Sequence, residues 1–249
     1  MQKLQTSNLM MITESNLCYY CESLATNRDH LPPSCFFPRS KYLPQGSKNY
    51  RNNLVTVPSC ELHNNLRSKD DEYTAALFAL TAGSPLSSEL LSSKWIPSLL
   101  RNEGSLGKRI FRNSRPVSIV VKEGRILIQR ETVQLTIEVD RIERVLESIA
   151  KGIFFQHNNC QRCWNGGCMV FGLNLLSKDL KPADNAHDLA MLNECFKRLE
   201  DQQGLGLDRR GSHPDIFYYQ YFQTNSGIVK IRMVFYTNIV FLVFLCHSN

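Results

Sequence analysis

The fold is decided by two short stretches, Cys-Tyr-Tyr-Cys at residues 18–21 and Cys-Glu-Leu-His-Asn-Asn at residues 60–65. Each stretch places two metal-binding side chains on one tight turn, first as C-x-x-C and then as C-x-x-H. The four residues Cys18, Cys21, Cys60 and His63 have the spacing of a closed tetrahedral shell for structural zinc. The 38 residues between the two pairs exceed what a simple finger needs. We therefore expect further structure inside the loop that the zinc closes.

The composition agrees with a metal-binding role for these cysteines. Nine cysteines fit a complete disulfide framework poorly, and paired cysteines in a reducing compartment more often bind metal than each other. Met1–Leu17 contains no basic start followed by an apolar block, so we expect no signal peptide. No stretch reaches the ~18 consecutive apolar residues of a membrane span. We therefore expect a cytoplasmic protein with no membrane partner.

The positive charge of the chain is concentrated after the zinc-binding region. The net charge is +6, and residues 81–130 alone hold nine Lys or Arg against three Glu. Such a belt is typical of a phosphate-binding surface, while a solvated helix face is the plainer explanation. The candidate phosphate contacts in this belt are Lys108, Arg109, Arg112 and Arg115.

Periodicity predicts three segments: residues 12–81 with the zinc site, a basic helical connector at 82–116, and an α+β domain of unknown role at 117–249. Apolar residues at helical spacing predict helices from about Lys69 to Thr81 and over Ser87–Leu100, Val139–Ile153 and Asp188–Glu200. Strand patterns flank Lys-Glu-Gly, which predicts a hairpin of Val117–Val121 with Arg125–Gln129. Ile216–Cys246 is rich in aromatic and β-branched residues and predicts two or three strands, with Val234–Cys246 as buried strand.

Three further features accompany the zinc pairs, two of them between the pairs and one directly after the second. They are Asp29-His30 followed by Leu31-Pro32-Pro33, then Asn53-Leu54-Val55-Thr56-Val57-Pro58, and Asn64 directly after the second pair. This order resembles the zinc-stapled HNH endonucleases of bacteria and phages. Residues 60–65 resemble the C-x-x-C-N of that family, with His63 in place of the usual second cysteine. Lys69-Asp70-Asp71-Glu72-Tyr73 resembles the start of the last helix in a bacterial subgroup. The resemblance covers residues 15–80, about a quarter of the chain.

The resemblance implies an α+β fold in which an N-terminal zinc-stapled ββα-metal finger precedes a helical connector and an α+β C-terminal domain. In this family a β-hairpin carries the Asp-His pair, a loop carries a central Asn, and a helix carries the last metal ligand. The zinc would be purely structural, and a second, exchangeable Mg²⁺ or Mn²⁺ would serve catalysis.

The resemblance also implies a role for each site residue in hydrolysing DNA, with RNA not excluded. His30 would be the general base, since a neutral imidazole can accept the proton of the attacking water. Asp29 and Asn64 would hold the divalent cation through oxygen. Asn53 would pin the loop and orient His30, and Arg67 and Lys69 would contact phosphate. A role in bacterial or phage defence is compatible with this activity, as is a homodimer or a regulatory partner bound through the C-terminal domain.

Several alternatives stay open. An isolated Asp-His pair is most often a surface turn, Asn53 could cap a turn, and Asn64 could cap the following helix. A catalytically inactive zinc-finger module that binds nucleic acid through the basic belt would carry the same residues. A second zinc site at Cys160, Cys163 and Cys168 lacks a matching second pair of ligands, which favours packing there instead.

Overall fold

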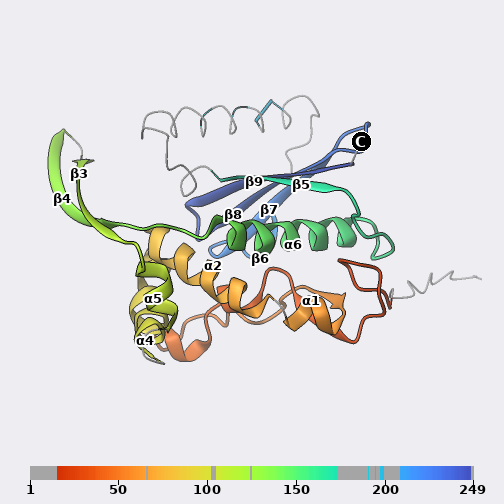
Figure 1. The fold of residues 1–249 in the computed structure, drawn as a ribbon, viewed down its shortest axis with the longest axis horizontal. Coiled ribbons are helices and arrows are strands. Elements are labelled where there is room, and N and C mark those ends of the chain that lie inside the picture. The colour runs from red at the N-terminus through yellow and green to blue at the C-terminus, as the bar shows by residue number, and fades with distance from the viewer. Residues whose placement is uncertain are drawn as a thin grey trace, which may run out of the picture.

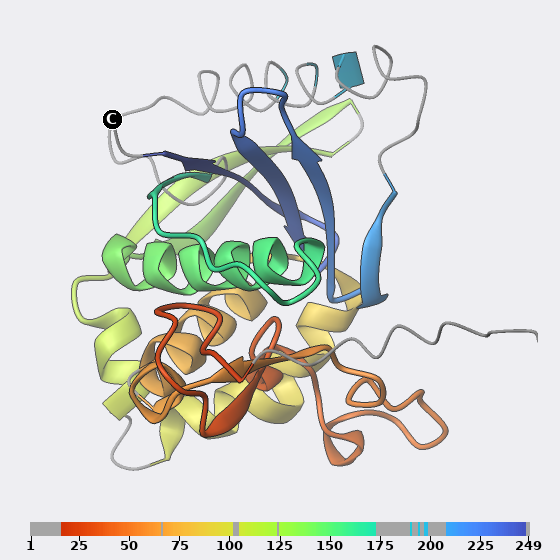
Figure 2. The same ribbon diagram turned by 90° about the vertical axis from the view of Figure 1, so that its right-hand side faces the viewer.

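One long helix organises the chain. The computed structural model describes residues 16–65, 67–101, 105–123, 125–172 and 208–247, with the single positions 190, 194, 197 and 198. Within them, α6 (Val139–His157) lies between an antiparallel sheet and a layer formed by the N-terminal segments (Figure 1, Figure 2). The predicted mixture of helix and sheet is confirmed.

The burial of α6 reflects this central position. In its first half the apolar positions Ile142, Val145 and Leu146 are buried while Glu143 and Arg144 are exposed, as expected for an amphipathic helix. From Ser148 to Phe155 every residue is buried, including Lys151. A helix covered on one side only would keep an exposed stripe, so this all-round burial shows that both layers cover its second half.

The sheet packs against α6 and has the strand order β5-β9-β8-β7-β6, with all neighbours antiparallel. Its strands are β5 (Gly167–Gly172), β6 (Arg210–His213), β7 (Phe217–Gln223), β8 (Val229–Phe235) and β9 (Ile239–Cys246). Three strands therefore occupy Ile216–Cys246, as expected. The apolar run Val234–Cys246 is divided between the end of β8 and the whole of β9, because Tyr236 and Thr237 adopt positive φ angles of 48° and 67° and reverse the chain between them.

The N-terminal layer contains a small hairpin followed by two helices. The strands β1 (Asn27–His30) and β2 (Thr56–Ser59) pair antiparallel, and α1 (Glu61–Asn65) and α2 (Ser68–Thr81) follow β2 directly. Two short 3₁₀ turns, η1 (Ser34–Phe36) and η2 (Ser40–Tyr42), lie in the connection between the strands. The helix α2 begins and ends within a residue of the predicted bounds.

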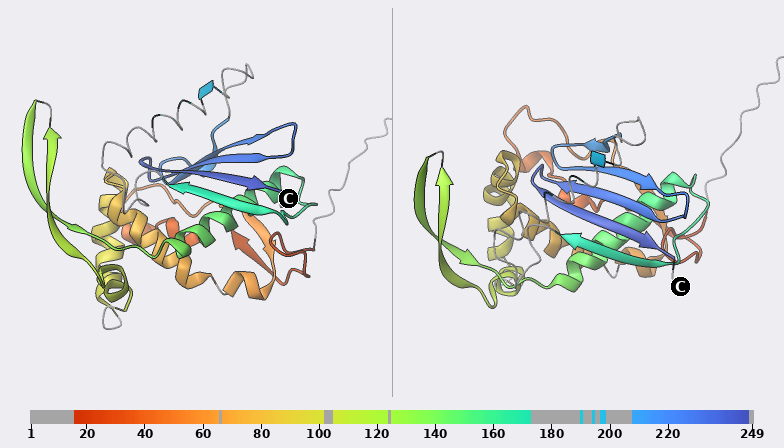
Figure 3. Two further views of the ribbon diagram at one scale, coloured as in Figure 1. Left: turned by 45° about the horizontal axis from the view of Figure 1, so that its top comes forward. Right: turned by 90° about the horizontal axis from the view of Figure 1, so that it is seen from above.

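The connector forms several short helices in place of the single helix expected over Ser87–Leu100. They are α3 (Pro85–Leu90), the π-helical turn η3 (Leu91–Trp95), α4 (Ile96–Leu100) and α5 (Ser105–Phe111). Pro97 lacks an N–H donor, so the regular α-helical bond pattern cannot run through this region. The expected hairpin follows as β3 (Arg115–Glu123) and β4 (Ile126–Gln134), and it projects away from the remaining layers (Figure 1, Figure 3).

The three predicted segments share one hydrophobic core. Buried residues of the N-terminal layer, the connector, α6 and the sheet form a continuous cluster that includes Phe36, Phe78, Trp95, Phe154 and Phe235. The helix predicted at Asp188–Glu200 falls mainly outside the described residues. No helix in the described ranges combines the length and the apolar character needed to cross a membrane.

One buried hydrogen bond joins the sheet to the N-terminal layer. The Tyr236 hydroxyl donates to the Phe36 carbonyl at 2.8 Å, and Tyr236 is completely buried. Replacing Tyr236 by Phe leaves that carbonyl without its partner, so we expect the free energy of unfolding to fall by about 1–2 kcal/mol. Urea denaturation measures this loss. Tyr218→Phe is the matched control, because the half-buried Tyr218 hydroxyl makes only a long contact of 3.5 Å with Arg232. Equal stability of the two variants would contradict the expectation.

Candidate metal centre

The two predicted ligand pairs meet in space. Cys18 and Cys21 lie on a turn closed by hydrogen bonds from the Cys18 amide to the Ser23 carbonyl at 2.7 Å and from the Glu22 amide to the Cys18 carbonyl at 3.1 Å. Cys60 and His63 lie where β2 passes into α1. The metal-binding atoms of all four residues lie within 4.8 Å of one another. The structure therefore contains the Cys₃His cluster that the spacing predicts.

The distances within this cluster fit a tetrahedral zinc ion. Zn–S bonds of 2.3 Å in a tetrahedron place two sulfurs about 3.8 Å apart, and a shorter Zn–N bond places sulfur and nitrogen about 3.5 Å apart. The Sγ atoms of Cys21 and Cys60 are 3.8 Å apart. The Nδ1 atom of His63 lies 3.2 Å from Cys60 Sγ and 3.8 Å from Cys18 Sγ. The cluster is thus compatible with zinc binding.

Neighbouring residues support the ligands. The Tyr20 ring stacks on the His63 ring with centroids 4.4 Å apart, and the Lys151 ammonium lies over the Tyr20 ring, 4.0 Å from its centroid. Burial lowers the pKa of His63, as do the positive charges of Arg67 and Lys151. The imidazole is therefore neutral near pH 7, which is the form that binds metal. The Cys163 thiol donates a hydrogen bond to the Cys18 carbonyl at 3.1 Å, so Cys163 contacts the turn that carries Cys18 and Cys21.

The hairpin places Asp29 and His30 on opposite faces. Asp29 pairs with Val57 and His30 pairs with Thr56, so successive side chains alternate. His30 is exposed, on the same face as Arg28, whose Nε donates to the Thr56 hydroxyl at 2.9 Å. The carboxylate of Asp29 instead faces the helices, and burial raises its pKa while the charges of Arg67 and His30 oppose that rise. His30 is therefore accessible to a ligand from solvent.

The Asp29 carboxylate is already engaged by Arg67. Arg67 Nη2 donates to Asp29 Oδ2 at 2.5 Å, and Arg67 Nε donates to the His63 carbonyl at 2.9 Å. The two charged side chains are only 10% and 15% exposed, so this is a buried ion pair. Arg67 was expected to contact phosphate, but in the structure it joins the Cys₃His cluster to Asp29. Aspartates 70 and 71 begin α2 nearby, and burial raises the pKa of Asp71 to about 7.

The two asparagines lie at different ends of the hairpin. Asn64 is partly buried in α1, which packs beside β1, and its backbone amide donates to the Cys60 carbonyl at 3.0 Å. Asn53 is exposed in the loop before β2, with a φ of 56°. Two hydrogen bonds from β6 reach this loop, which Arg51 also fastens to the Phe37 and Ser34 carbonyls at 3.1 and 3.0 Å. Ser212 donates to the Asn53 carbonyl at 2.6 Å, and the His213 Nε2 atom lies 2.9 Å from the Asn52 carbonyl.

The predicted phosphate contacts are divided between two places. Lys69 is exposed in the first turn of α2, close to the metal cluster, whereas Lys108, Arg109, Arg112 and Arg115 are exposed on and after α5. Figure 1 shows α5 beside the C-terminal end of α2, at the opposite end from α1. The 14 residues of α2 span about 21 Å. The basic belt is therefore separated from α1, which carries His63, by most of the length of this helix.

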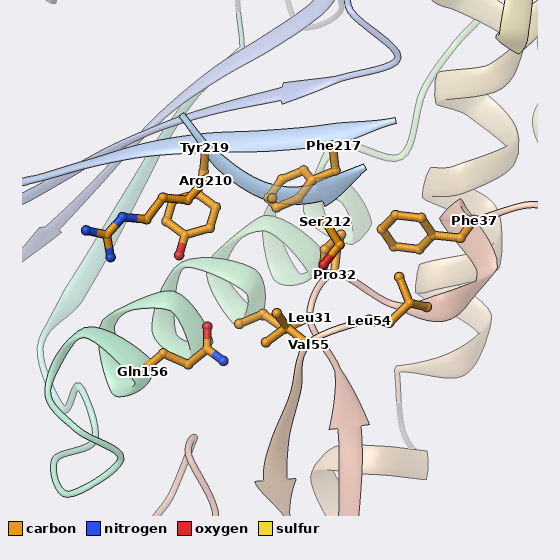
Figure 4. A pocket seen from close by; sticks show the side chains of 11 residues that line it. Leu31, Pro32, Phe37, Leu54, Val55, Gln156, Arg210, Ser212, Phe217 and Tyr219 are labelled. Carbon is orange, nitrogen blue, oxygen red and sulfur yellow. The ribbon is translucent and has the colours of Figure 1, made fainter. Parts of the chain in front are cut away.

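A cavity of about 260 Å³ opens where the hairpin ends. It lies between the end of β1–β2, the last turn of α6 and the strands β6 and β7 (Figure 4). Its walls include Leu31 and Val55, which neighbour His30 and Thr56 in sequence, and Arg210 and Tyr219 from the sheet. No pattern in the sequence predicts this cavity, because its walls come from segments more than 100 residues apart.

Comparison of the chain with protein-family models, with curated proteins and with solved structures finds no match. The site is therefore interpreted from its own residues. Among the described residues, the cluster at Cys18, Cys21, Cys60 and His63 is where three or more candidate ligands converge. Cys160, Cys163 and Cys168 do not form a second such group there.

Removal of one cluster ligand provides the test of zinc binding. Cys60→Ser should lose bound zinc and lower the thermal midpoint, because zinc-binding energy in such clusters stabilises the fold directly. Atomic emission spectroscopy and a melting curve measure both effects. Cys246→Ser on β9 is the matched control and should keep the metal. Equal zinc content in the wild type and the Cys60 variant would contradict zinc binding at the cluster.

Proposed function

We propose that this protein is a metal-dependent endonuclease of the HNH type that hydrolyses phosphodiester bonds in DNA. The observation that carries the proposal is the placement of Asp29-His30 on a hairpin whose partner strand leads into the zinc ligands and then into the helix with Asn64. The order of strand, strand and helix around a Cys₃His cluster agrees with a ββα-metal finger. The cytoplasm is the proposed location.

In this proposal His30 is the general base. Its exposed ring lies on the open face of the hairpin, where a substrate phosphate and its attacking water can reach it. A neutral imidazole accepts the proton of that water as the phosphorus–oxygen bond forms. Arg28 and Lys69 are exposed cations close by that suit the phosphates on either side. The zinc cluster fixes the strands and takes no part in the reaction.

Asp29 and Asn64 would hold the divalent cation, Mg²⁺ or Mn²⁺, which neutralises the charge that develops on phosphate. The Asp29 carboxylate meets this need only in part, because Arg67 binds its Oδ2 atom in the structure. Arg67 leaves Oδ1 outside the ion pair. A cation would therefore share Asp29 with Arg67 or displace it.

The same ion pair supports a second candidate function. A module that binds nucleic acid without cutting it would have no use for a free Asp29 carboxylate, and a buried Arg67–Asp29 pair would then serve only the fold. The exposed basic belt around α5 would provide the affinity. The length of α2, which separates this belt from α1, corresponds to about six base pairs of B-DNA.

Plasmid cleavage tests the catalytic proposal. Wild-type protein with Mg²⁺ or Mn²⁺ should nick supercoiled DNA, and His30→Ala should reduce the rate by about 10²-fold or more because the general base is lost. Asn64→Ala should likewise reduce cleavage, while Asn65→Ala, its exposed neighbour in α1, should not. Zinc content should stay unchanged in all three variants. A wild-type protein that is folded and zinc-loaded but cuts no nucleic acid would remove the catalytic proposal in favour of the binding module.

Neutralising the basic belt tests DNA binding separately from catalysis. Replacement of Lys108, Arg109, Arg112 and Arg115 by Gln should weaken binding and lower the dependence of affinity on salt, because fewer counterions are released. Fluorescence anisotropy at several salt concentrations measures both. Arg162→Gln, which removes an exposed charge from the loop after α6, is the control and should change neither quantity. Unchanged binding by the belt variant would show that DNA contacts a different face.

A further inference from the structure

The proposed function leaves one large element of the fold without a role, the hairpin β3–β4. Its strands have nine residues each, which corresponds to a ribbon about 30 Å long. Both views in Figure 3 show this ribbon clear of the other described layers, and β3 and β4 pack mainly on each other. A two-stranded hairpin alone is only marginally stable in water. A partner that covers the ribbon therefore stabilises it.

The charge of this region favours an anionic partner. Residues 108–134 hold seven Lys or Arg against two Glu, which is a net charge of +5, whereas the whole chain has +6. The basic belt leads directly into the ribbon, because its last member, Arg115, is the first residue of β3. Arg115, Arg125 and Arg130 are exposed. The Nε atom of Arg115 donates to the neutral amide oxygen of Gln134 at 2.7 Å, a contact that leaves its positive charge uncancelled.

The two faces of the ribbon differ in charge, since cross-strand partners lie on the same face. One face combines two cations, two further hydrogen-bonding side chains and two β-branched apolar side chains. They form the cross-strand pairs Arg115–Gln134, Val117–Thr132 and Ile119–Arg130. We call these six residues the arginine face. The opposite face carries Glu131, and there Gln129 Nε2 donates to the Ser118 hydroxyl at 2.7 Å. Of the two, the arginine face is the one that suits an anion.

The arginine face matches the major groove of B-DNA in size and chemistry. That groove is about 12 Å wide and admits a two-stranded β-ribbon. Within it, arginine binds the edge of guanine, an amide side chain binds adenine, and an apolar side chain contacts the methyl group of thymine. Ile119, beside Arg130, is 44% exposed and so available for the last of these contacts. A second copy of the chain packed on the same face would instead oppose like charges.

We propose that β3–β4 is a DNA-binding arm that enters the major groove with the arginine face toward the bases. This inference rests on the DNA-binding part of the proposed function and is independent of the catalytic residues. The basic belt at the root of the arm contacts the phosphates that flank the same groove, and the arm contacts the base edges. The belt thus contributes affinity, and the arm contributes preference among sequences.

A shortened arm provides the test. Pro116 and Val133 are cross-strand partners, so replacing residues 117–132 by Asn-Gly closes the ribbon with a two-residue turn and keeps its root. The removed part is about 24 Å long, or about seven base pairs. In binding titrations without divalent cation, the shortest DNA duplex bound with full affinity should be about seven base pairs shorter for this variant than for the wild type. Methylation of guanine N7, which lies in the major groove, should weaken wild-type binding about tenfold and leave the variant unaffected.

Point variants test which face enters the groove. Arg130→Gln should weaken binding about tenfold and remove the effect of guanine methylation, because a base contact is lost. Ile119→Thr should weaken binding to thymine-containing duplexes. The matched control is Val120→Thr, since Val120 is the next residue, is 66% exposed and lies on the opposite face, and this change should leave binding unaltered. Melting curves confirm that each variant is folded.

The possible failures are distinguishable. If the wild type binds DNA and the shortened variant requires the same duplex length, the arm is overturned and the nuclease proposal stands. Sedimentation velocity of the free proteins identifies contacts between copies of the chain, because an oligomer lost on shortening, with an unchanged duplex length, overturns DNA as the partner of the arm. A wild type that binds but does not cut removes the catalytic proposal alone, and the duplex lengths still decide the arm. A wild type that neither binds nor cuts overturns both.

Discussion

The Cys₃His cluster is the constraint on which the N-terminal layer depends. It fastens the turn at Cys18 and Cys21 to the junction of β2 and α1, and it closes a loop of 38 residues between its two pairs. A two-stranded hairpin is marginally stable in water, and β1 and β2 have four residues each. Three sulfurs and a neutral imidazole at tetrahedral spacing are held together far better by a cation than by contacts with one another. A metal ion bound at this cluster would therefore help to fix the positions of Asp29 and His30.

Arg67 connects this cluster to the residues proposed for chemistry. One side chain contacts the His63 carbonyl, the Asp29 carboxylate and, at 5.7 Å, the Tyr19 ring. Removing one partner of a buried ion pair leaves an uncompensated charge, so the arrangement is sensitive to either residue. A cation that binds Asp29 must compete with a guanidinium already in hydrogen-bonding position. The metal-binding residues and the proposed catalytic residues are therefore coupled through Arg67.

Sequence reasoning succeeded where spacing or periodicity carries the information. The four cluster residues, α2, the hairpin β3–β4 and the strands after Ile216 follow from local patterns, which contacts elsewhere in the chain do not alter. It failed where contacts between residues far apart in the sequence determine the structure. The sequence shows that Arg67 lies just before α2, which suggested a phosphate contact. It does not show that the Arg67 side chain is buried against Asp29. The all-round burial of α6 after Ser148 requires both layers, and the cavity at Arg210 and the support of the Asn53 loop by Ser212 bring together segments more than 100 residues apart in sequence.

The attachment of β6 to the loop before β2 limits how the N-terminal layer can be exchanged or re-engineered. Ser212 and His213 hold the carbonyls of Asn52 and Asn53, and Tyr236 reaches Phe36 in the same connection. Residues 16–81 therefore do not form a unit that can be transferred alone, since the geometry of their loop depends on contacts with another part of the polypeptide. A chimera that transplants them alone would leave Phe36 and Val57 uncovered. A segment that keeps these contacts has to include α6 and the sheet.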